Sequence, residues 1–594
     1  MINIRPRSAL AVRRIKLIVH ELLIILIFFS IFFNNKYLYN SSNYVAGHYN
    51  FALIIGLTLF LLFLSEVLFK RSSIQITFMD IAFGLFVCVL FCSRLNSNFI
   101  FFNEILINFL LVASLYLIIR LHHDFYRLIG LLKVLCFAVV LEFIFSLINF
   151  YPSFRPLTFY GFSGNSGLTA CLIVVAYPLI MCGVKNKTSY QIVLTIFYFV
   201  ILTVIQSRAA FLSLIYAVGY FISVSFLSNS NQKKIIKKIF VIVAIVLAIL
   251  FFLYLLLIKQ DSISGRLIIW KITLSNFREY FMSGIGYGEF PVSYQTWQRN
   301  YISSGQLDLK FAHLVDLPNN VFNEPLQIFV ETGLAGFLSF VYLVYLIYSS
   351  KPCIKSSIIQ AMKVSLGVVL IFSLFSYPFH SMPILAFVII ILACLSNFSK
   401  ADFHIIVKPV AFSVLTFFLC FMSLVILWEI NKKNKAVESW SKSNVLKKEP
   451  RKLVLQLSKI YNQLNENGSF LFCYARAMHE SGNYNASINL IDRCILAQSN
   501  IDAYLLKGEC YEKQKQFAKA EEMYNIVQFT IPSRLTAKSY LFNLYRKQND
   551  SLNAKNIAID ILKSPMKVFS INGYKIKAEV KLYLDSIGVS TLLY

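Results

Sequence analysis

Long apolar stretches constrain this chain more than any other feature of its sequence. A helix that crosses the hydrocarbon core of a bilayer needs about 20 mostly apolar residues, whereas a soluble domain rarely contains even one such stretch. Thirteen candidate spans occur, at residues 17–33, 51–69, 76–92, 99–119, 128–150, 167–184, 189–206, 209–227, 239–258, 328–349, 357–376, 382–398 and 409–429. The sequence therefore predicts an all-α protein whose main part is a polytopic transmembrane helical bundle of about 13 spans.

Lysine and arginine gather in every second connection between these stretches. The basic segments are RPRSALAVRRIK ahead of the first stretch, then KRSS (70–73), RLHHDFYR (120–127), KNK (185–187), KKIIKK (233–238) and KPCIK (351–355). Because short cytoplasmic loops carry an excess of positive charge, we expect the N-terminus in the cytoplasm and, after an odd number of crossings, the C-terminus outside. This distribution also accounts for the net charge of +27 without a nucleic-acid partner.

A repeat follows the last apolar stretch, where the composition becomes polar and helical after NKKNK (431–435). Three segments align, each at the junction of two predicted helices: GNYNASINLI (482–491), KQFAKAEEMY (515–524) and NDSLNAKNIA (549–558). Their small residues Ser487, Ala520 and Ala554 are spaced 33 and 34 positions apart. A period of about 34 residues with a small residue where paired helices meet resembles tetratricopeptide repeats, which stack into an α-solenoid with a concave surface for a protein or peptide partner.

Three regions follow from these patterns. Residues 1–150 hold N-terminal transmembrane helices, residues 151–430 form a transmembrane core with an external loop at 259–327, and residues 431–594 form a soluble helical repeat domain. A charged group at the centre of a spanning helix costs roughly 2.5–3.5 kcal/mol unless pairing or function retains it. Arginines and carboxylates at the external ends of the spans are therefore the first candidates for a functional site.

Two arginines stand at such external positions. Arg208, in QSRAA (206–210), lies between two spans on the side where the positive-inside rule disfavours arginine. A function explains it better than an interface anchor whose charge reaches back to water. Arg266, in SGRLIIW (264–270), begins an amphipathic helix, and an interfacial helix with ordinary basic flanks is the alternative explanation there.

The stretch NNVFNEPLQIFVETGLAG (319–336) places polar side chains along the start of a membrane helix. Gln327 and Glu331 are four positions apart and share a helix face, with Asn323 and Glu324 on or near it. A capping role for Asn323 and a favourable helix dipole at Glu324 would explain these two without a function. They leave Glu331 unexplained, two turns into the helix. We expect a polar stripe that faces the bundle interior or a water-filled cavity.

Four motifs, in order over roughly residues 150–350, resemble those of the O-antigen ligase/polymerase superfamily of bacterial envelope proteins. GFSGNSGLTACLIVVAYPL (161–179) is similar to the Gly-x-x-Gly-Asn segment of the superfamily, and QSRAA is similar to its Ser-Arg motif. SGRLIIW with GIGYGEF (284–290) is similar to its Gly-Arg-x-x-x-Trp and Gly-x-Gly-x-Gly pair. FNEPLQIFVETGLAG (322–336) is similar to its His-Asn-x-x-Leu-Gln…Glu-x-Gly-x-x-Gly motif. The resemblance implies a glycosyltransferase C-like bundle in the bacterial inner membrane, with the repeat domain in the periplasm.

The resemblance also implies a reaction. Members of the superfamily transfer a glycan from undecaprenyl diphosphate, at the outer face of the inner membrane, to lipid A–core, a growing polysaccharide or a protein, and they need neither a metal nor a nucleotide cofactor. By position it assigns binding of the donor diphosphate to Arg208 and Arg266, whose bidentate hydrogen bonds suit its oxygens. Asn323, Gln327 and Glu331 would support the site.

The sequence departs from the superfamily where a proton acceptor is needed. Phe322 stands in place of the usual histidine and cannot take the proton of the acceptor hydroxyl. Glu324 or His313, in DLKFAHLVDLPNN, is then the candidate base, although His313 is equally explained as an exposed loop residue. Two further explanations remain: a reaction dissociative enough to need little help from a base, and a member that is inactive or binds the lipid donor for another purpose.

Three functions compete. Glycan transfer by a ligase-type glycosyltransferase is our prediction, and the repeat domain favours a protein partner or acceptor. A transporter of lipid-linked glycans would suit the many spans, but the polar residues concentrate on one face, and the sequence shows no inverted repeat of broken helices. A non-catalytic scaffold that recruits envelope proteins through its repeats would fit the departure at Phe322.

Overall fold

The computed structural model describes residues 57, 60, 74–96, 104–120, 125–151, 154–161, 164–184, 188–226, 260–353, 356–400, 402–405, 409–564 and 570–589. The regular elements of these residues are helices, except for two three-residue strands, β1 (Ile74–Ile76) and β2 (Phe403–Ile405), which pair antiparallel. Apart from this short ribbon, the all-helical prediction is confirmed for the described residues. The predicted spans at 17–33, 51–69 and 239–258 lie outside them, save residues 57 and 60.

The helices group into two compact units. We call the first the bundle unit, which comprises Met1–Ser93, Phe102–Ile258 and Phe322–Val437. The second, the repeat unit, comprises Arg94–Phe101, Lys259–Val321 and Glu438–Tyr594. The long connection that ends at Val321 thus belongs with the C-terminal helices, and the polar stripe that follows it belongs with the bundle.

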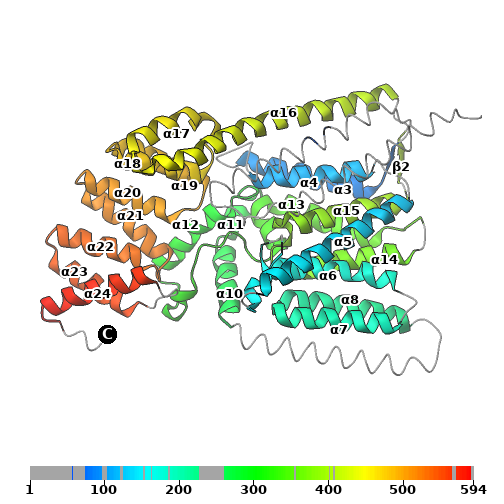
Figure 1. The fold of residues 1–594 in the computed structure, drawn as a ribbon, viewed down its shortest axis with the longest axis horizontal. Helices are drawn as coiled ribbons and strands as arrows, with labels where there is room; N and C mark the ends of the chain where they lie inside the picture. The colour runs from blue at the N-terminus through cyan, green and yellow to red at the C-terminus, as the bar shows by residue number, and fades with distance from the viewer. Residues whose placement is uncertain are drawn as a thin grey trace, which may run out of the picture. The chain divides into compact units, whose positions relative to one another are not determined.

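The bundle unit is built from apolar helices that lie side by side (Figure 1). They are α3 (Phe78–Ser93), α4 (Glu104–Arg120), α5 (Phe125–Phe150), α6 (Ser166–Gly183), α7 (Thr188–Ile205), α8 (Arg208–Phe226), α13 (Glu324–Ser349), α14 (Ser357–Ser373), α15 (Met382–Phe398) and most of α16 (Pro409–Ser443), with single turns η3 (Pro156–Thr158) and η5 (Pro378–His380). Among the described residues, three helices are long and apolar enough to cross a membrane, at Leu128–Phe150, Ser166–Gly183 and Glu324–Ser349, and five apolar helices are shorter. These helices support a membrane protein, and the number of 13 spans stays a prediction.

Helix α6 is buried because it is apolar on every side. Its residues from Leu168 to Leu179 are all buried, and it packs against α5, α8 and α14. The Ser213 hydroxyl on α8 donates to the Val368 carbonyl on α14 at 3.0 Å. A Cβ on Gly367 would lie 2.5 Å from the Tyr216 hydroxyl, so α8 and α14 touch there. Residue numbers rise along α8 as they fall along α14, and the start of α8 therefore lies beside the end of α14.

The repeat unit contains helical pairs joined by short turns, visible as a stack in Figure 1. Its elements are η2 (Arg94–Asn96), α10 (Gln260–Ser275), α11 (Phe277–Tyr280), α12 (Phe290–Ser303), η4 (Leu309–Leu314), η6 (Asn444–Lys448), α17 (Pro450–Leu464), α18 (Gly468–Glu480), α19 (Tyr484–Ala497), α20 (Ile501–Lys513), α21 (Phe517–Thr530), α22 (Leu535–Lys547), α23 (Ser551–Lys563) and α24 (Ile571–Ser586). Ser487, Ala520 and Ala554 are at most 1% exposed, on the second helix of successive pairs. Their burial fits the predicted helix contacts, and the tetratricopeptide assignment stays a prediction.

The connection between residues 260 and 321 packs on these repeats. Helix α12 contacts α19 and α21. The Gln298 side chain donates to the Thr530 carbonyl at 2.7 Å, and the Ser499 hydroxyl donates to Gln295 at 2.7 Å. These polar contacts anchor the connection to the C-terminal helices.

Candidate functional site

The first turn of α13 gathers buried polar side chains. The Asn323 side chain accepts a hydrogen bond from the Leu326 amide at 2.9 Å and caps the helix. Its own amide donates to the carbonyl of Leu374, the residue after α14, at 3.1 Å. Glu324 follows at the positive end of the helix dipole, which favours a carboxylate, and it is only 2% exposed. The capped helix end therefore holds a buried acidic group beside the end of α14.

Glu324 receives its partners from η5, the turn between α14 and α15. The Phe379 amide donates to Glu324 Oε1 at 2.7 Å, and His380 Nδ1 lies 3.3 Å from the same oxygen. A carboxylate only accepts hydrogen bonds, so Nδ1 carries a proton in this pair and Nε2 of the neutral ring carries the lone pair. Burial lowers the pKa of His380, but the carboxylates of Glu324 and Glu331 outweigh burial and hold this pKa above its ordinary value.

The rest of the polar stripe also faces inward. Gln327 donates from Nε2 to Glu331 Oε1 at 2.7 Å, and neither residue is more than 3% exposed. Both side chains are therefore buried on the shared face that the i, i+4 spacing predicted, and the bundle interior is one of the two expected surroundings. Gly333 has φ 67° and ψ −164°, which breaks the helical geometry of α13. This conformation favours glycine because a side chain would be strained there.

Phe322 has a strained backbone conformation, and its side chain contacts the turn between α14 and α15, which in turn contacts the start of α6. Its φ is 60°, in the left-handed region that side-chain-bearing residues rarely adopt. The ring packs edge-on against Tyr377, with ring centroids 5.3 Å apart. The Tyr377 hydroxyl in turn lies 3.4 Å from the side-chain nitrogen of Asn165, which caps α6 by accepting from the Gly167 amide at 2.8 Å. The starts of α6 and α13 therefore meet the turn between α14 and α15.

Arg208 lies at this same end of the bundle. It is the first residue of α8, and the start of α8 lies beside the end of α14 through the Ser213–Val368 hydrogen bond. Gln206, two residues earlier, has φ 56°, a second strained position directly before a motif residue. The structure thus brings Arg208 to the bundle end that holds Glu324.

Arg266 and His313 belong to the repeat unit and are described within it. Arg266 lies half-buried on α10, and His313 lies half-buried on η4, which packs against α10. On the same helix, Trp270 Nε1 donates to the Val321 carbonyl at 2.8 Å. The two arginines, and likewise Glu324 and His313, are therefore divided between the two units, and their predicted cooperation stays a prediction.

The backbone conformation of the GIGYGEF turn requires its glycines. Gly284, Gly286 and Gly288 have φ of 70°, 104° and 84°, so each position needs a residue without a side chain. The buried Arg94 fixes this turn, because it donates to the Tyr287 carbonyl at 2.9 Å and pairs with Glu289 at 2.5 Å. The turn is a structural feature of the repeat unit.

Sequence reasoning missed three residues at the bundle end: His380, Tyr377 and Glu142. Glu142 is fully buried on α5 and accepts from the Thr169 hydroxyl at 3.0 Å. A Cβ on Gly161 would lie 2.3 Å from its carboxylate, which explains one glycine of the GFSGNSG motif. A lone carboxylate inside an apolar run was the available signal for Glu142. A lone histidine between two apolar runs was the signal for His380.

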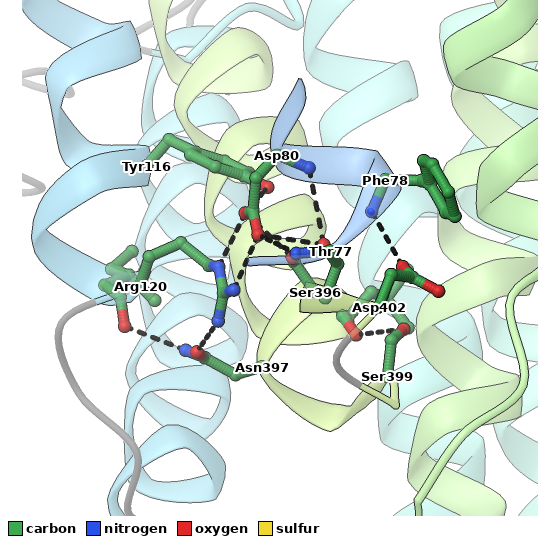
Figure 2. Close-up of polar contacts among 11 residues, drawn as sticks. Thr77, Phe78, Asp80, Tyr116, Arg120, Ser396, Asn397, Ser399 and Asp402 are labelled. Atoms are coloured by element: carbon green, nitrogen blue, oxygen red, sulfur yellow. Dashed lines mark hydrogen bonds and ion pairs between the residues drawn. The ribbon is translucent and has the colours of Figure 1, made fainter. Parts of the chain in front are cut away.

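A second polar cluster ties the opposite end of the bundle together (Figure 2). Figure 2 shows the Asp80 carboxylate and the Arg120 guanidinium pointing toward one another, with two contacts of 2.6 Å. Arg120 also donates to Asn397, near the end of α15. Asn397 lies about 22 Å along α15 from Met382, given 1.5 Å per helical residue. Among the described residues, no group of three or more metal-binding side chains occurs at either end.

The fold and the site together define a helical membrane protein with a buried acidic and basic cluster at one end of its bundle. Comparison with known families agrees: the family described as O-antigen ligase matches residues 193–341 of the 594-residue chain. The match supports the ligase/polymerase superfamily and a role in glycan transfer during polysaccharide assembly. No curated protein matches the chain.

Proposed function

We propose that this protein transfers a glycan from a polyprenyl diphosphate, of the undecaprenyl type, to an acceptor hydroxyl at the periplasmic face of the bacterial inner membrane. The observation that carries the proposal is the extent of the O-antigen ligase match. Residues 193–341 include both arginines and the whole polar stripe of α13. The acceptor is lipid A–core, a growing polysaccharide or a protein.

Arginine at the site suits the leaving group of this reaction. As the glycosidic bond breaks, negative charge grows on the diphosphate oxygens, and guanidinium groups stabilise it through paired hydrogen bonds. We assign this role to Arg208 and Arg266. Asn323 fixes the start of α13 against the end of α14, and the pair Gln327–Glu331 keeps the stripe behind it ordered. These residues hold the geometry in which Glu324 acts.

The repeat unit supplies the contact with a protein partner or acceptor in this proposal. Its three helix pairs begin at Gly468, Ile501 and Leu535, which repeats the spacing of 33 and 34 residues seen in the sequence. Stacked helix pairs of this kind present an extended surface to a protein or peptide. We place this unit in the periplasm, with the N-terminus in the cytoplasm.

Single substitutions in the native host test the proposal. Arg208→Ala, Arg266→Ala and Glu324→Ala should each lose the surface glycan and accumulate the lipid-linked donor outside the membrane. Loss of either arginine removes a transition-state donor, which costs about 10²–10³ in rate, and loss of Glu324 removes a carboxylate that acts in the proton transfer. Arg278→Ala, an exposed arginine on α11, is the matched control and should keep the glycan. Donor trapped inside would instead indicate a transporter. Unchanged glycan in all variants at normal expression would indicate a scaffold.

A further inference from the structure

The proposed reaction needs a group that accepts the proton of the acceptor hydroxyl, and Phe322 cannot accept it. The structure offers a group that sequence reasoning did not consider. His380 lies 56 positions after Glu324 in the sequence, yet its Nδ1 approaches the Glu324 carboxylate at 3.3 Å. We propose that His380 is the catalytic base and that Glu324 is its positioning residue. This inference rests on the proposed function.

Burial decides which member of the pair meets the substrate. The Glu324 side chain is 2% exposed, and its Oε1 is already occupied by the Phe379 amide at 2.7 Å and the imidazole. The His380 side chain is 15% exposed. An acceptor hydroxyl therefore reaches the ring more readily than the carboxylate. The carboxylate holds Nδ1–H and leaves the Nε2 lone pair as the base, the same division of roles as in a hydrolase triad.

The turn that carries His380 lies next to Phe322, the residue that stands in place of the superfamily histidine. Pro378 opens η5, and the His380 amide donates to the Tyr377 carbonyl at 3.2 Å. The Tyr377 ring packs against Phe322, the residue in the position of the superfamily histidine. Glu324 itself is two residues from Phe322. In this proposal the base lies on the turn that faces the start of α13, at the same end of the bundle as Phe322.

The step balances without any further reactant. The acceptor hydroxyl gives its proton to His380 Nε2, and its oxygen forms a bond to the anomeric carbon of the glycan. The bond between that carbon and the diphosphate oxygen breaks, and the polyprenyl diphosphate leaves with the electron pair. The imidazolium that forms is stabilised by the Glu324 carboxylate. It returns its proton to water before the next cycle.

Chemical rescue tests the base directly. In membranes of the native host that carry the full chain, with lipid-linked glycan extracted from the same host as donor, His380→Ala should transfer glycan about 10²–10⁴ times more slowly than wild type. Added imidazole should restore a measurable part of that rate, because it supplies the missing base and fits the space left by the ring. Arg208→Ala is the matched control: it should be as slow and should gain nothing from imidazole.

A second variant distinguishes loss of the base from misfolding of His380→Ala. Phe322→His in the His380→Ala background returns a base to the superfamily position, and we expect it to recover transfer. His380→Ala at near wild-type rate, or a loss that neither imidazole nor Phe322→His relieves at normal expression, would overturn the base assignment while the arginine variants still report on transfer. Transfer absent from the wild type in every fraction would overturn the proposed function itself. Loss in His313→Ala with full activity in His380→Ala would assign the base to the loop.

Discussion

Substitution Asp80→Asn should destabilise the bundle unit severely, because Asp80 is the centre of the cluster in Figure 2. Its carboxylate accepts two hydrogen bonds of 2.6 Å from Arg120, one of 2.6 Å from the Tyr116 hydroxyl and one of 2.9 Å from Ser396. Asparagine keeps the shape but removes the charge, which leaves the Arg120 guanidinium, 10% exposed, without its counter-ion. Breaking a fully buried ion pair from one side costs about 3–5 kcal/mol; the Asp80 side chain is 18% exposed, so we expect the lower part of that range.

A double-mutant cycle separates the ion pair from general damage. Arg120→Met alone should also be costly, because it leaves the Asp80 carboxylate buried with fewer donors. The double variant Asp80→Asn/Arg120→Met should lose less than the sum of the two single losses, since neither partner is then an uncompensated charge. Coupling energies for residues in direct contact are about 0.5–3 kcal/mol, and we expect the upper part of that range.

The assay measures the unfolding of the purified full chain in detergent micelles, as a function of temperature or of denaturant concentration. Glu449→Gln is the matched control, because Glu449 and Lys452 form an ion pair whose side chains are 52% and 69% exposed, and it should produce no measurable change. Asp80→Asn with the stability of that control would show that the Asp80–Arg120 pair does not stabilise the bundle unit. A double variant that loses the full sum of the single losses would show that the two side chains are not energetically coupled.

Two further predictions concern the other clusters. His380 has a folded-state pKa above its ordinary value, because the carboxylates of Glu324 and Glu331 outweigh burial. The protonated ring should therefore stabilise the folded protein fully below the unfolded pKa of about 6.5, and this stabilisation should decline as the pH rises through the folded pKa. Over that pH window the wild type should lose more thermal stability than His380→Ala. Gly508→Ala should destabilise the repeat unit by about 1–3 kcal/mol, because the new Cβ would lie 2.3 Å from the Tyr524 ring. Gly265→Ala is the control and should not destabilise it, because a Cβ there has no other atom within 4 Å. Limited proteolysis of the full chain compares the stability of the two variants.

Local periodicity made much of the fold predictable. The apolar runs that the structure describes are helices, because a segment that is apolar over many residues favours burial as a helix whatever its neighbours are. The shared face of Gln327 and Glu331 followed from their spacing, since residues four apart share a helix face, and its inward direction followed from the cost of polar groups in lipid. The buried small residues of the repeat followed from their period in the same way.

Long-range contacts were not predictable from local patterns. His380 meets Glu324 only because α14 returns the chain to the start of α13, and no periodicity connects residues 56 positions apart. The contact between Arg120 and Asp80 was not predicted for a different reason. The basic segment that contains Arg120 was explained fully by the positive-inside rule, and that explanation left no reason to look for a partner such as Asp80.

The two polar clusters of the bundle differ in a way that bears on function. Asp80 has every donor supplied by the protein, so it is a closed structural contact that holds α3, α4 and α15 in register. Glu324 holds a histidine whose ring is still partly exposed and whose second nitrogen is left to accept a proton. A catalytic base must be both oriented and reachable. Of the two clusters described, the Glu324–His380 pair is the one that meets both conditions.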